Sequence, residues 1–160
     1  MAKKCNLKIY NLNKENKNGG KAMNRYEELI EMALEARMLA YAPYSHFMVG
    51  AALLGKDGVV YKGCNVENAS YPATNCAERT AIFSAVADGQ REFEAIAIVG
   101  GSEYAEKLEF CAPCGVCRQV MREFCVPESF EIILAKSTKE YKVFTLEELL
   151  PMSFGPENLE

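Results

Sequence analysis

Two kinds of apolar spacing alternate along this chain, and their order limits the possible fold more than any other feature of the sequence. Helical spacing, with apolar residues three or four apart, alternates with short apolar runs bounded by turn residues. The predicted helices are residues 25–41, 76–87, 114–124 and a short one capped by Thr145, and the predicted strands are 47–54, 59–61, 94–99, 130–135 and 141–144. This order predicts an α/β fold in which helices cover both faces of one sheet.

Turn and capping residues set the expected limits of several segments. Asn24 is placed to cap the first helix, and Pro43 is expected to stop it. Asp57 and Gly58 lie between two apolar runs, which is a hairpin signal. Residues 63–75 are polar and irregular, as binding loops tend to be.

The length of 160 residues and a hydrophobic share of 49% suit a single ordinary domain. Residues 1–22 are rich in Lys and Asn, have no sustained apolar period, and are predicted to be a disordered leader. Residues 23–160 are predicted to form the folded domain, for which Met23 would be a natural start.

Charge and cysteine content bear on partners and compartment. The net charge of -4 argues against a basic groove along a phosphate backbone and favours a small neutral substrate, although a local basic patch is compatible with an acidic total. We find neither an apolar run of about eighteen residues nor a secretion signal, so no membrane association and a cytoplasmic location are expected. Seven clustered cysteines in a reducing compartment favour metal binding or catalysis over disulfides.

Three thiols and one acid form the chemical centre of the sequence. Cys114 and Cys117 are spaced so that both can reach one tetrahedral ion, but this spacing alone also fits a redox pair or a structural metal site. Cys76 adds a third thiol, and Glu78 adds a proton carrier two residues later. The spacing works if Cys76 begins a helix and Glu78 leans over the open coordination position. Alternatively, Glu78 is simply an acid favoured at a helix start.

Three thiolates leave the fourth position of the ion open to water, which is typical of a catalytic site. They also give the centre a negative charge that weakens the ion as a Lewis acid. Helix amino ends and Arg79, through hydrogen bonds to the sulfur atoms, are expected to offset this charge. The alternative for Arg79 is a solvated surface charge.

Four segments together resemble the free-nucleoside cytidine deaminases, and the similarity extends from about Met23 to Leu159. They are residues 41–45 (YAPYS), 63–68 (GCNVEN), 76–80 (CAERT) and 113–119 (PCGVCRQ). The three-cysteine pattern is similar to the small homotetrameric branch of that family. The resemblance implies a cytidine-deaminase-like three-layer α/β/α sandwich with a mixed sheet of about five strands.

The resemblance also implies an activity and a cofactor. Cys76, Cys114 and Cys117 would bind one Zn²⁺ per subunit, and Glu78 would act as acid and base. The reaction would be hydrolytic deamination of cytidine and deoxycytidine to uridine and deoxyuridine with release of ammonia, a step of pyrimidine salvage.

A further set of residues is implied to bind the nucleoside, and part of it would come from a neighbouring subunit. Asn65 and Glu67 would hydrogen-bond the ribose, and Phe47 would pack near the pyrimidine. The complete implied set is Phe47, Asn65, Val66, Glu67, Ala69, Tyr71, Ala77 and Phe154, of which Tyr71 and Phe154 would be lent to a neighbour's pocket. The alternatives are a core role for Phe47, a polar turn at Asn65 and Glu67, and an anchoring role for Phe154.

The chain departs from the family pattern in its spare thiols, Cys64 and Cys111, which are expected to be buried small hydrophobes. His46, the single histidine, is expected to be a turn residue. Three rival functions remain: a related deaminase acting on another nucleoside of the blasticidin type, a non-catalytic module pinned by zinc, and polynucleotide editing, which the charge disfavours.

Overall fold

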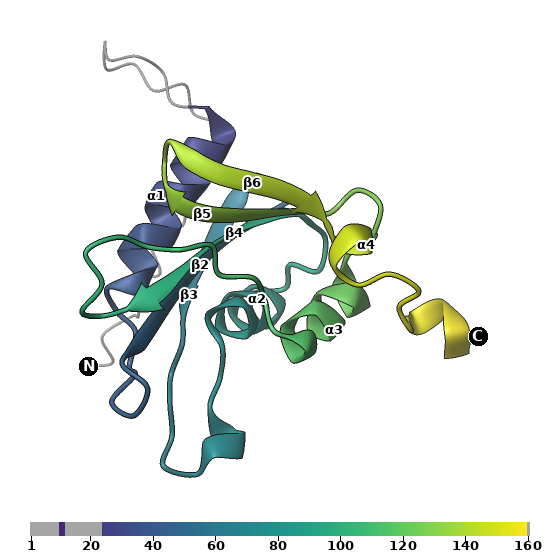
Figure 1. Ribbon diagram of the computed structural model, residues 1–160. Coiled ribbons are helices and arrows are strands. Elements are labelled where there is room, and N and C mark those ends of the chain that lie inside the picture. Colours follow the sequence, from purple (N-terminus) through teal and green to yellow (C-terminus); the bar gives the residue numbers. More distant parts are fainter. Residues whose placement is uncertain (1–9, 12–23, 160) are drawn as a thin grey trace, which may run out of the picture.

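A single sheet flanked by helices forms the body of the protein (Figure 1). The computed structural model describes residues 10–11 and 24–159. The strands are β1 (Tyr10–Asn11), β2 (Phe47–Gly55), β3 (Val59–Cys64), β4 (Phe93–Ser102), β5 (Glu131–Ser137) and β6 (Glu140–Thr145). The helices are α1 (Arg25–Arg37), α2 (Ala77–Ala87), α3 (Gly115–Phe124) and α4 (Leu146–Leu149), with 3-10 turns η1 (Tyr71–Ala73) and η2 (Pro156–Leu159).

The sheet is mixed, which confirms the predicted fold class. Its strand order is β1-β3-β2-β4-β5-β6, and β4 and β5 form the parallel pair while the other neighbours are antiparallel. Strands β2 to β6 are the five that were expected. The two-residue β1 lies within the predicted leader and pairs with Val59 and Val60. The rest of that prediction lies outside the described residues.

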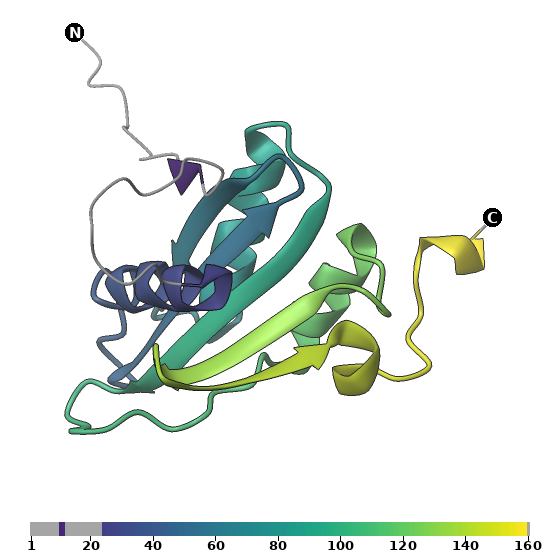
Figure 2. The same cartoon turned by 90° about the horizontal axis from the view of Figure 1, so that it is seen from above.

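Both faces of the sheet are covered, which explains why its central strands are almost continuously apolar. In β2, Ala51 and Leu53 face a cluster that includes α2, α3 and α4, whereas Ala52 and Leu54 face α1. Figure 2 shows α1 on one side of the sheet and α2 and α3 on the other. The alternation of side chains along each strand therefore builds two separate cores.

Two glycines allow the helices to come very close to the sheet. A Cβ atom at Gly50 in β2 would overlap the α1 backbone at Ala33 and Arg37, and one at Gly63 in β3 would overlap the α2 backbone at Ala77 and Ala81. Gly63 pairs with Ala51, the residue next to Gly50, so the two approaches lie at the same level of the sheet on neighbouring strands. Gly63 thus sets the depth at which the amino end of α2 is held.

The first helix is shorter than predicted. It ends at Arg37 with Met38 as its carboxyl cap, whereas the apolar spacing had extended to residue 41. The reason lies in Tyr41, whose backbone is extended and pairs with the β3–α2 loop through bonds to the Asn65 carbonyl and from the Glu67 amide. Leu39, expected on the apolar face, is 72% exposed.

The observed ends of other strands differ from the predicted ends by a few residues. The hairpin at residues 56–58 is confirmed, with Gly58 at a φ of 81°. However, β3 runs three residues beyond the predicted strand and so includes Gly63 and Cys64, which had been assigned to the loop. Strand β4 also extends beyond the predicted end, to Ser102, because its end pairs antiparallel with the start of β2.

The predicted amino cap of α1 is present as a complete capping box. The Asn24 side chain accepts a hydrogen bond from the Glu27 amide at 3.0 Å, and the Glu27 carboxylate accepts one from the Asn24 amide. We expect Asn24→Ala to lower the free energy of unfolding by about 1 kcal/mol, because an orphan amide loses its partner. Urea denaturation checks this value, with Asn24→Ser as the control that keeps a capping oxygen. An unchanged midpoint for Asn24→Ala would contradict it.

Candidate metal centre and substrate site

Three thiols converge where α2 and α3 begin. Cys76 and Cys114 are the amino-cap residues of α2 and α3, and Cys117 lies in the first turn of α3. Their sulfur atoms all lie within 4.8 Å of one another, and those of Cys76 and Cys114 are 3.9 Å apart. The fold therefore brings together segments 38 residues apart in the sequence.

This donor set fits a zinc ion. Thiolate ligands at about 2.3 Å around a tetrahedral ion are separated by about 3.8 Å, close to the separation of Cys76 and Cys114. Hydrogen bonding from the Cys117 thiol, helped by the Arg79 guanidinium, lowers the pKa of Cys76 to about 5, which favours the thiolate. Among the described residues, the cluster has three protein donors and no fourth His, Cys, Asp or Glu.

The Glu78 carboxyl is buried beside these thiols. It is 4% exposed and lies in the first turn of α2. Burial, together with the charge of Cys76, raises its pKa to about 7, and its side chain interacts with the Cys117 thiol. A carboxyl group in this position and with this proton affinity is suited to moving protons near neutral pH.

Arg79 lies against the same cluster. Its Nη2 donates to the Cys76 sulfur at 3.5 Å and to the Thr74 carbonyl at 3.2 Å. Its Nε is buried and has no hydrogen-bond partner among the described residues. The guanidinium thus places a positive charge next to the thiolates, rather than in solvent.

Asn65 and Glu67, the two polar residues implied for sugar binding, have distinct environments. Asn65 is buried, and its side chain accepts from the Val49 amide and donates to the Phe47 carbonyl, each at 2.8 Å. It therefore connects the β3–α2 loop to the start of β2. Each of its two amide atoms has capacity for a second hydrogen bond.

The Glu67 side chain lines a depression of about 360 Å³ with Tyr44, Ser45, Tyr71 and Thr74. Its carboxylate accepts hydrogen bonds from the turn before β2, and these bonds, led by that of the Ser45 hydroxyl, lower its pKa. The group is therefore held as an anion that can accept hydrogen bonds.

The remaining implied contact residues are spread over exposed segments. Phe47 is 42% exposed at the start of β2, so it is not a core residue. Val66 pairs with Asn75 across the base of the β3–α2 loop, and Ala69 is exposed in that loop. Ala77 is fully buried at the start of α2.

Tyr71 and Phe154 lie on outward-facing segments. Tyr71 is 71% exposed and packs edge-to-face on Tyr44 with ring centroids 6.0 Å apart. Phe154 is 58% exposed in the segment after α4, which runs outward past α3 in both views (Figures 1 and 2). That segment is bound to α3 by Gln119, which donates to the Phe154 carbonyl, and by Arg122, which contacts Ser153 and Glu157.

The spare thiols are only partly buried. Cys111 packs against Gly100, and burial raises its pKa to about 11. Cys64 donates to the Leu39 carbonyl at 3.4 Å. Neither belongs to the three-thiol cluster, and no cysteine among the described residues forms a disulfide.

Some contacts around this site were missed by the sequence analysis. His46 ends the turn as expected, but it has a φ of 55° and its Nδ1 lies 2.8 Å from a Glu103 carboxylate oxygen. Arg37 donates to backbone carbonyls of β2 and β4, which no local pattern reveals. The sequence also did not predict that Tyr44 and Ser45 donate hydrogen bonds to Glu67, although residues 41–45 had been singled out as a motif.

The structure thus combines a helix-covered mixed sheet with a three-thiol centre and a buried acid. A family model described as "Cytidine and deoxycytidylate deaminase zinc-binding region" matches residues 23–131. The chain belongs to this family, and zinc is the metal that its three-cysteine cluster is suited to bind.

Individual relatives agree with this assignment. A cytidine deaminase of Sporosarcina psychrophila is 48% identical over 133 residues, covering 83% of this chain and 93% of the relative. One of Halalkalibacterium halodurans is 49% identical over 131 residues, covering 82% and 95%. The crystal structure of the Burkholderia pseudomallei cytidine deaminase superposes with a TM-score of 0.73 at 51% identity, covering 82% of this chain and all of that one.

No helix among the described residues combines the length and the apolar character needed to cross a membrane.

Proposed function

We propose that this protein deaminates cytidine and deoxycytidine by hydrolysis, giving uridine or deoxyuridine and ammonia, and that it serves pyrimidine salvage. One observation carries the proposal: a buried carboxyl, Glu78, lies beside a three-thiol cluster that has no fourth protein donor among the described residues. The family and the names of its close relatives support this substrate class.

The proposal assigns a role to each of these groups. Cys76, Cys114 and Cys117 hold zinc, which when bound makes a water molecule more acidic and a better nucleophile. Glu78 would accept a proton from the attacking water as the oxygen of that water bonds to C4 of the pyrimidine. Glu78 passes this first proton to N3, then carries the second proton, from the hydroxyl group now on C4, to the amino group, and the C4–N bond breaks to leave a carbonyl at C4 and release ammonia. Arg79 offsets the negative charge of the three thiolates.

The nucleoside is proposed to lie between the metal centre and the β3–α2 loop. Phe47 packs near the pyrimidine, the Ala77 backbone holds the base, and Asn65 and Glu67 receive the sugar hydroxyls. Val66 and Ala69 shape the same loop. The exposure of Phe47 and the spare hydrogen-bonding capacity of Asn65 support this arrangement.

The test combines zinc content and turnover on one purified sample. We expect one zinc per subunit and conversion of cytidine to uridine. The conversion is monitored by the loss of ultraviolet absorbance. A panel with a blasticidin-type nucleoside and single-stranded DNA distinguishes the rival substrates. Full zinc with no reaction on any compound would instead indicate a non-catalytic module.

Assembly is proposed to complete each pocket, in a homotetramer within the cytoplasm. The exposure of Tyr71 and Phe154 and the outward course of the C-terminal segment support shared pockets. The free thiols of the described cysteines are compatible with a reducing compartment.

Subunit mixing tests the shared pocket. Phe154→Ala is expected to lower kcat/KM about tenfold, the effect of losing one aromatic contact. Mixing it with Glu78→Gln subunits should restore turnover, because a site with an intact Glu78 then receives an intact Phe154. The control is a mixture of Glu78→Gln with the double variant Glu78→Gln/Phe154→Ala, which should stay inactive. Activity of the first mixture that never exceeds the sum of its parts would contradict sharing.

A further inference from the structure

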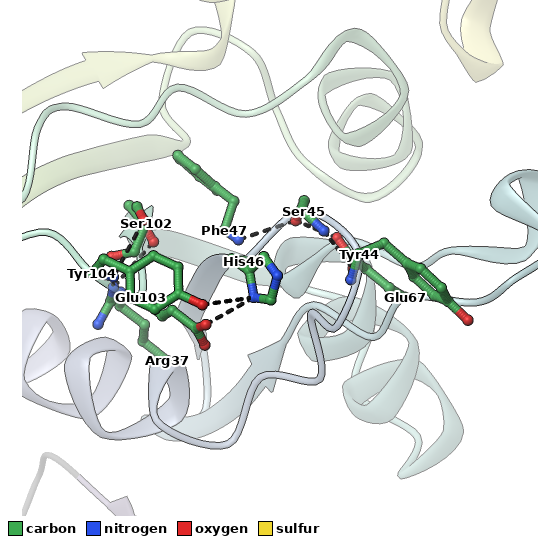
Figure 3. A network of polar contacts seen from close by, with 10 residues as sticks. Arg37, Tyr44, Ser45, His46, Phe47, Glu67, Ser102, Glu103 and Tyr104 are labelled. Atoms are coloured by element: carbon green, nitrogen blue, oxygen red, sulfur yellow. Dashed lines mark hydrogen bonds and ion pairs between the residues drawn. The ribbon is translucent and has the colours of Figure 1, made fainter.

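The turn between α1 and β2, residues 43–46, is held between two carboxylates from distant parts of the chain. Figure 3 shows Glu67 on one side, next to Tyr44 and Ser45, and Glu103 on the other, next to His46. Glu67 comes from the β3–α2 loop and Glu103 from the loop after β4.

On the first side, the turn supplies three hydrogen bonds to one carboxylate. The Glu67 Oε2 accepts from the Tyr44 amide at 2.9 Å and from the Ser45 amide at 3.2 Å, and its Oε1 accepts from the Ser45 hydroxyl. The two amides act on one oxygen, so the rotation of the carboxylate plane depends on the hydroxyl at the other oxygen. A carboxylate offers about four acceptor positions, which leaves one for a ligand.

The Ser45 hydroxyl also has a second partner. Its Oγ accepts a hydrogen bond from the Phe47 amide at 3.0 Å while donating to Glu67. Phe47 is the first residue of β2. One hydroxyl therefore links the orientation of Glu67 to the strand that carries Phe47.

On the second side, the turn is fixed independently of Glu67. The His46 Nδ1 lies 2.8 Å from the Glu103 carboxylate and 3.4 Å from the Tyr104 hydroxyl, and the Glu103 amide donates to the His46 carbonyl at 2.8 Å. Arg37 donates to the carbonyls of Met48 and Ser102 close by. Because these contacts do not involve Ser45, loss of its hydroxyl is expected to leave the turn in place.

We propose that Ser45 is a positioning residue that aims the free acceptor position of Glu67 at a hydroxyl group of the substrate's sugar. This inference rests on the proposed function, in which the substrate is a nucleoside and Glu67 faces its sugar. Ser45 thus contributes to selectivity for nucleosides whose sugar carries hydroxyl groups, without itself contacting the reacting atoms.

The experiment compares two substrates that differ only in the sugar, cytidine and 2′,3′-dideoxycytidine. Ser45→Ala should lower kcat/KM for cytidine roughly tenfold, mainly through KM, since one hydrogen bond to a charged group is misaligned. The slower turnover of dideoxycytidine should be unchanged. Ser45→Thr, which keeps the hydroxyl at this exposed position, should behave like the unaltered protein. Ser137→Ala is the matched control, because the Ser137 hydroxyl accepts from backbone amides of the distant β5–β6 hairpin.

A double-mutant cycle separates this role from a general effect on folding. If Ser45 acts through Glu67, adding Ser45→Ala to Glu67→Gln should cost little more than Glu67→Gln alone. Equal losses on both substrates, full additivity with Glu67→Gln, or no change in Ser45→Ala would each overturn the proposal. If the unaltered protein deaminates neither nucleoside, the proposed function itself fails, and this inference with it. If Glu67→Gln leaves the preference between the two sugars unchanged, the sugar assignment of Glu67 and this inference fail, whereas the proposed deamination stands.

Discussion

Glu78→Gln is expected to reduce kcat by at least about 10³-fold while zinc content stays at one per subunit. A single positioned proton carrier contributes about 10²- to 10⁴-fold, and here one carboxyl serves both the attack of water and the departure of ammonia. Gln has almost the same shape but cannot carry the proton. The measurement is steady-state turnover of cytidine together with metal analysis of the same sample.

The buried position of Glu78 makes a control for folding necessary. Because Gln relieves the cost of burying a charged group, the variant should unfold at a temperature no lower than the unaltered protein. Glu147→Gln, in the exposed first turn of α4, is the matched substitution and should leave kcat unchanged. Turnover of Glu78→Gln within a few-fold of the unaltered protein would refute the proton-carrier role.

Cys76→Ala is expected to remove most of the zinc, and activity with it. Two thiolates and solvent bind zinc far more weakly than three thiolates, and a metal held by all three would also join the starts of α2 and α3. The protein should therefore lose thermal stability, and added chelator should no longer lower its melting temperature. Metal analysis and thermal unfolding with and without chelator provide the measurements.

Cys111→Ser is the matched control for the loss of a ligand. The Cys111 thiol is close enough to Glu78 and Cys76 for their charges to raise its pKa, yet it is not one of the three clustered sulfurs. It should keep one zinc per subunit. Retained stoichiometric zinc in Cys76→Ala, or lost zinc in Cys111→Ser, would show that the ligand set is wrong.

The sequence was most informative where local chemistry decides the structure. The Asn24 cap, the Asp57-Gly58 hairpin and the succession of the five main strands and the helices along the chain follow from propensity and apolar period, and the structure confirms them. The predicted proximity of the Cys114 and Cys117 thiols is also observed, because two thiols on one helix turn need no knowledge of the tertiary fold.

The structure differs from the prediction where contacts with backbone far away in the sequence determine the end of an element or the partner of a side chain. The apolar period could not reveal that α1 ends at Arg37, because the competing partner of Tyr41 is the backbone of residues 65–67. Likewise, His46 had no local signal for its pairing with Glu103, 57 residues later in the sequence. Which residues complete the substrate pocket stays a prediction, since the Tyr71 and Phe154 side chains are largely exposed in the single chain.

The missing side chain at Gly63 has a consequence for redesign of the enzyme. This glycine lets α2 pack directly against β3, and Gly50 lets α1 pack directly against β2 on the other face of the sheet. The sheet therefore cannot shift away from α2, the helix that carries Glu78. Laboratory evolution towards bulkier pyrimidines cannot make room by shortening side chains between α2 and β3, because Gly63 has none. Extra room would have to come from the exposed residues 68–73 and the C-terminal segment, which lie outside the close contacts at Gly50 and Gly63.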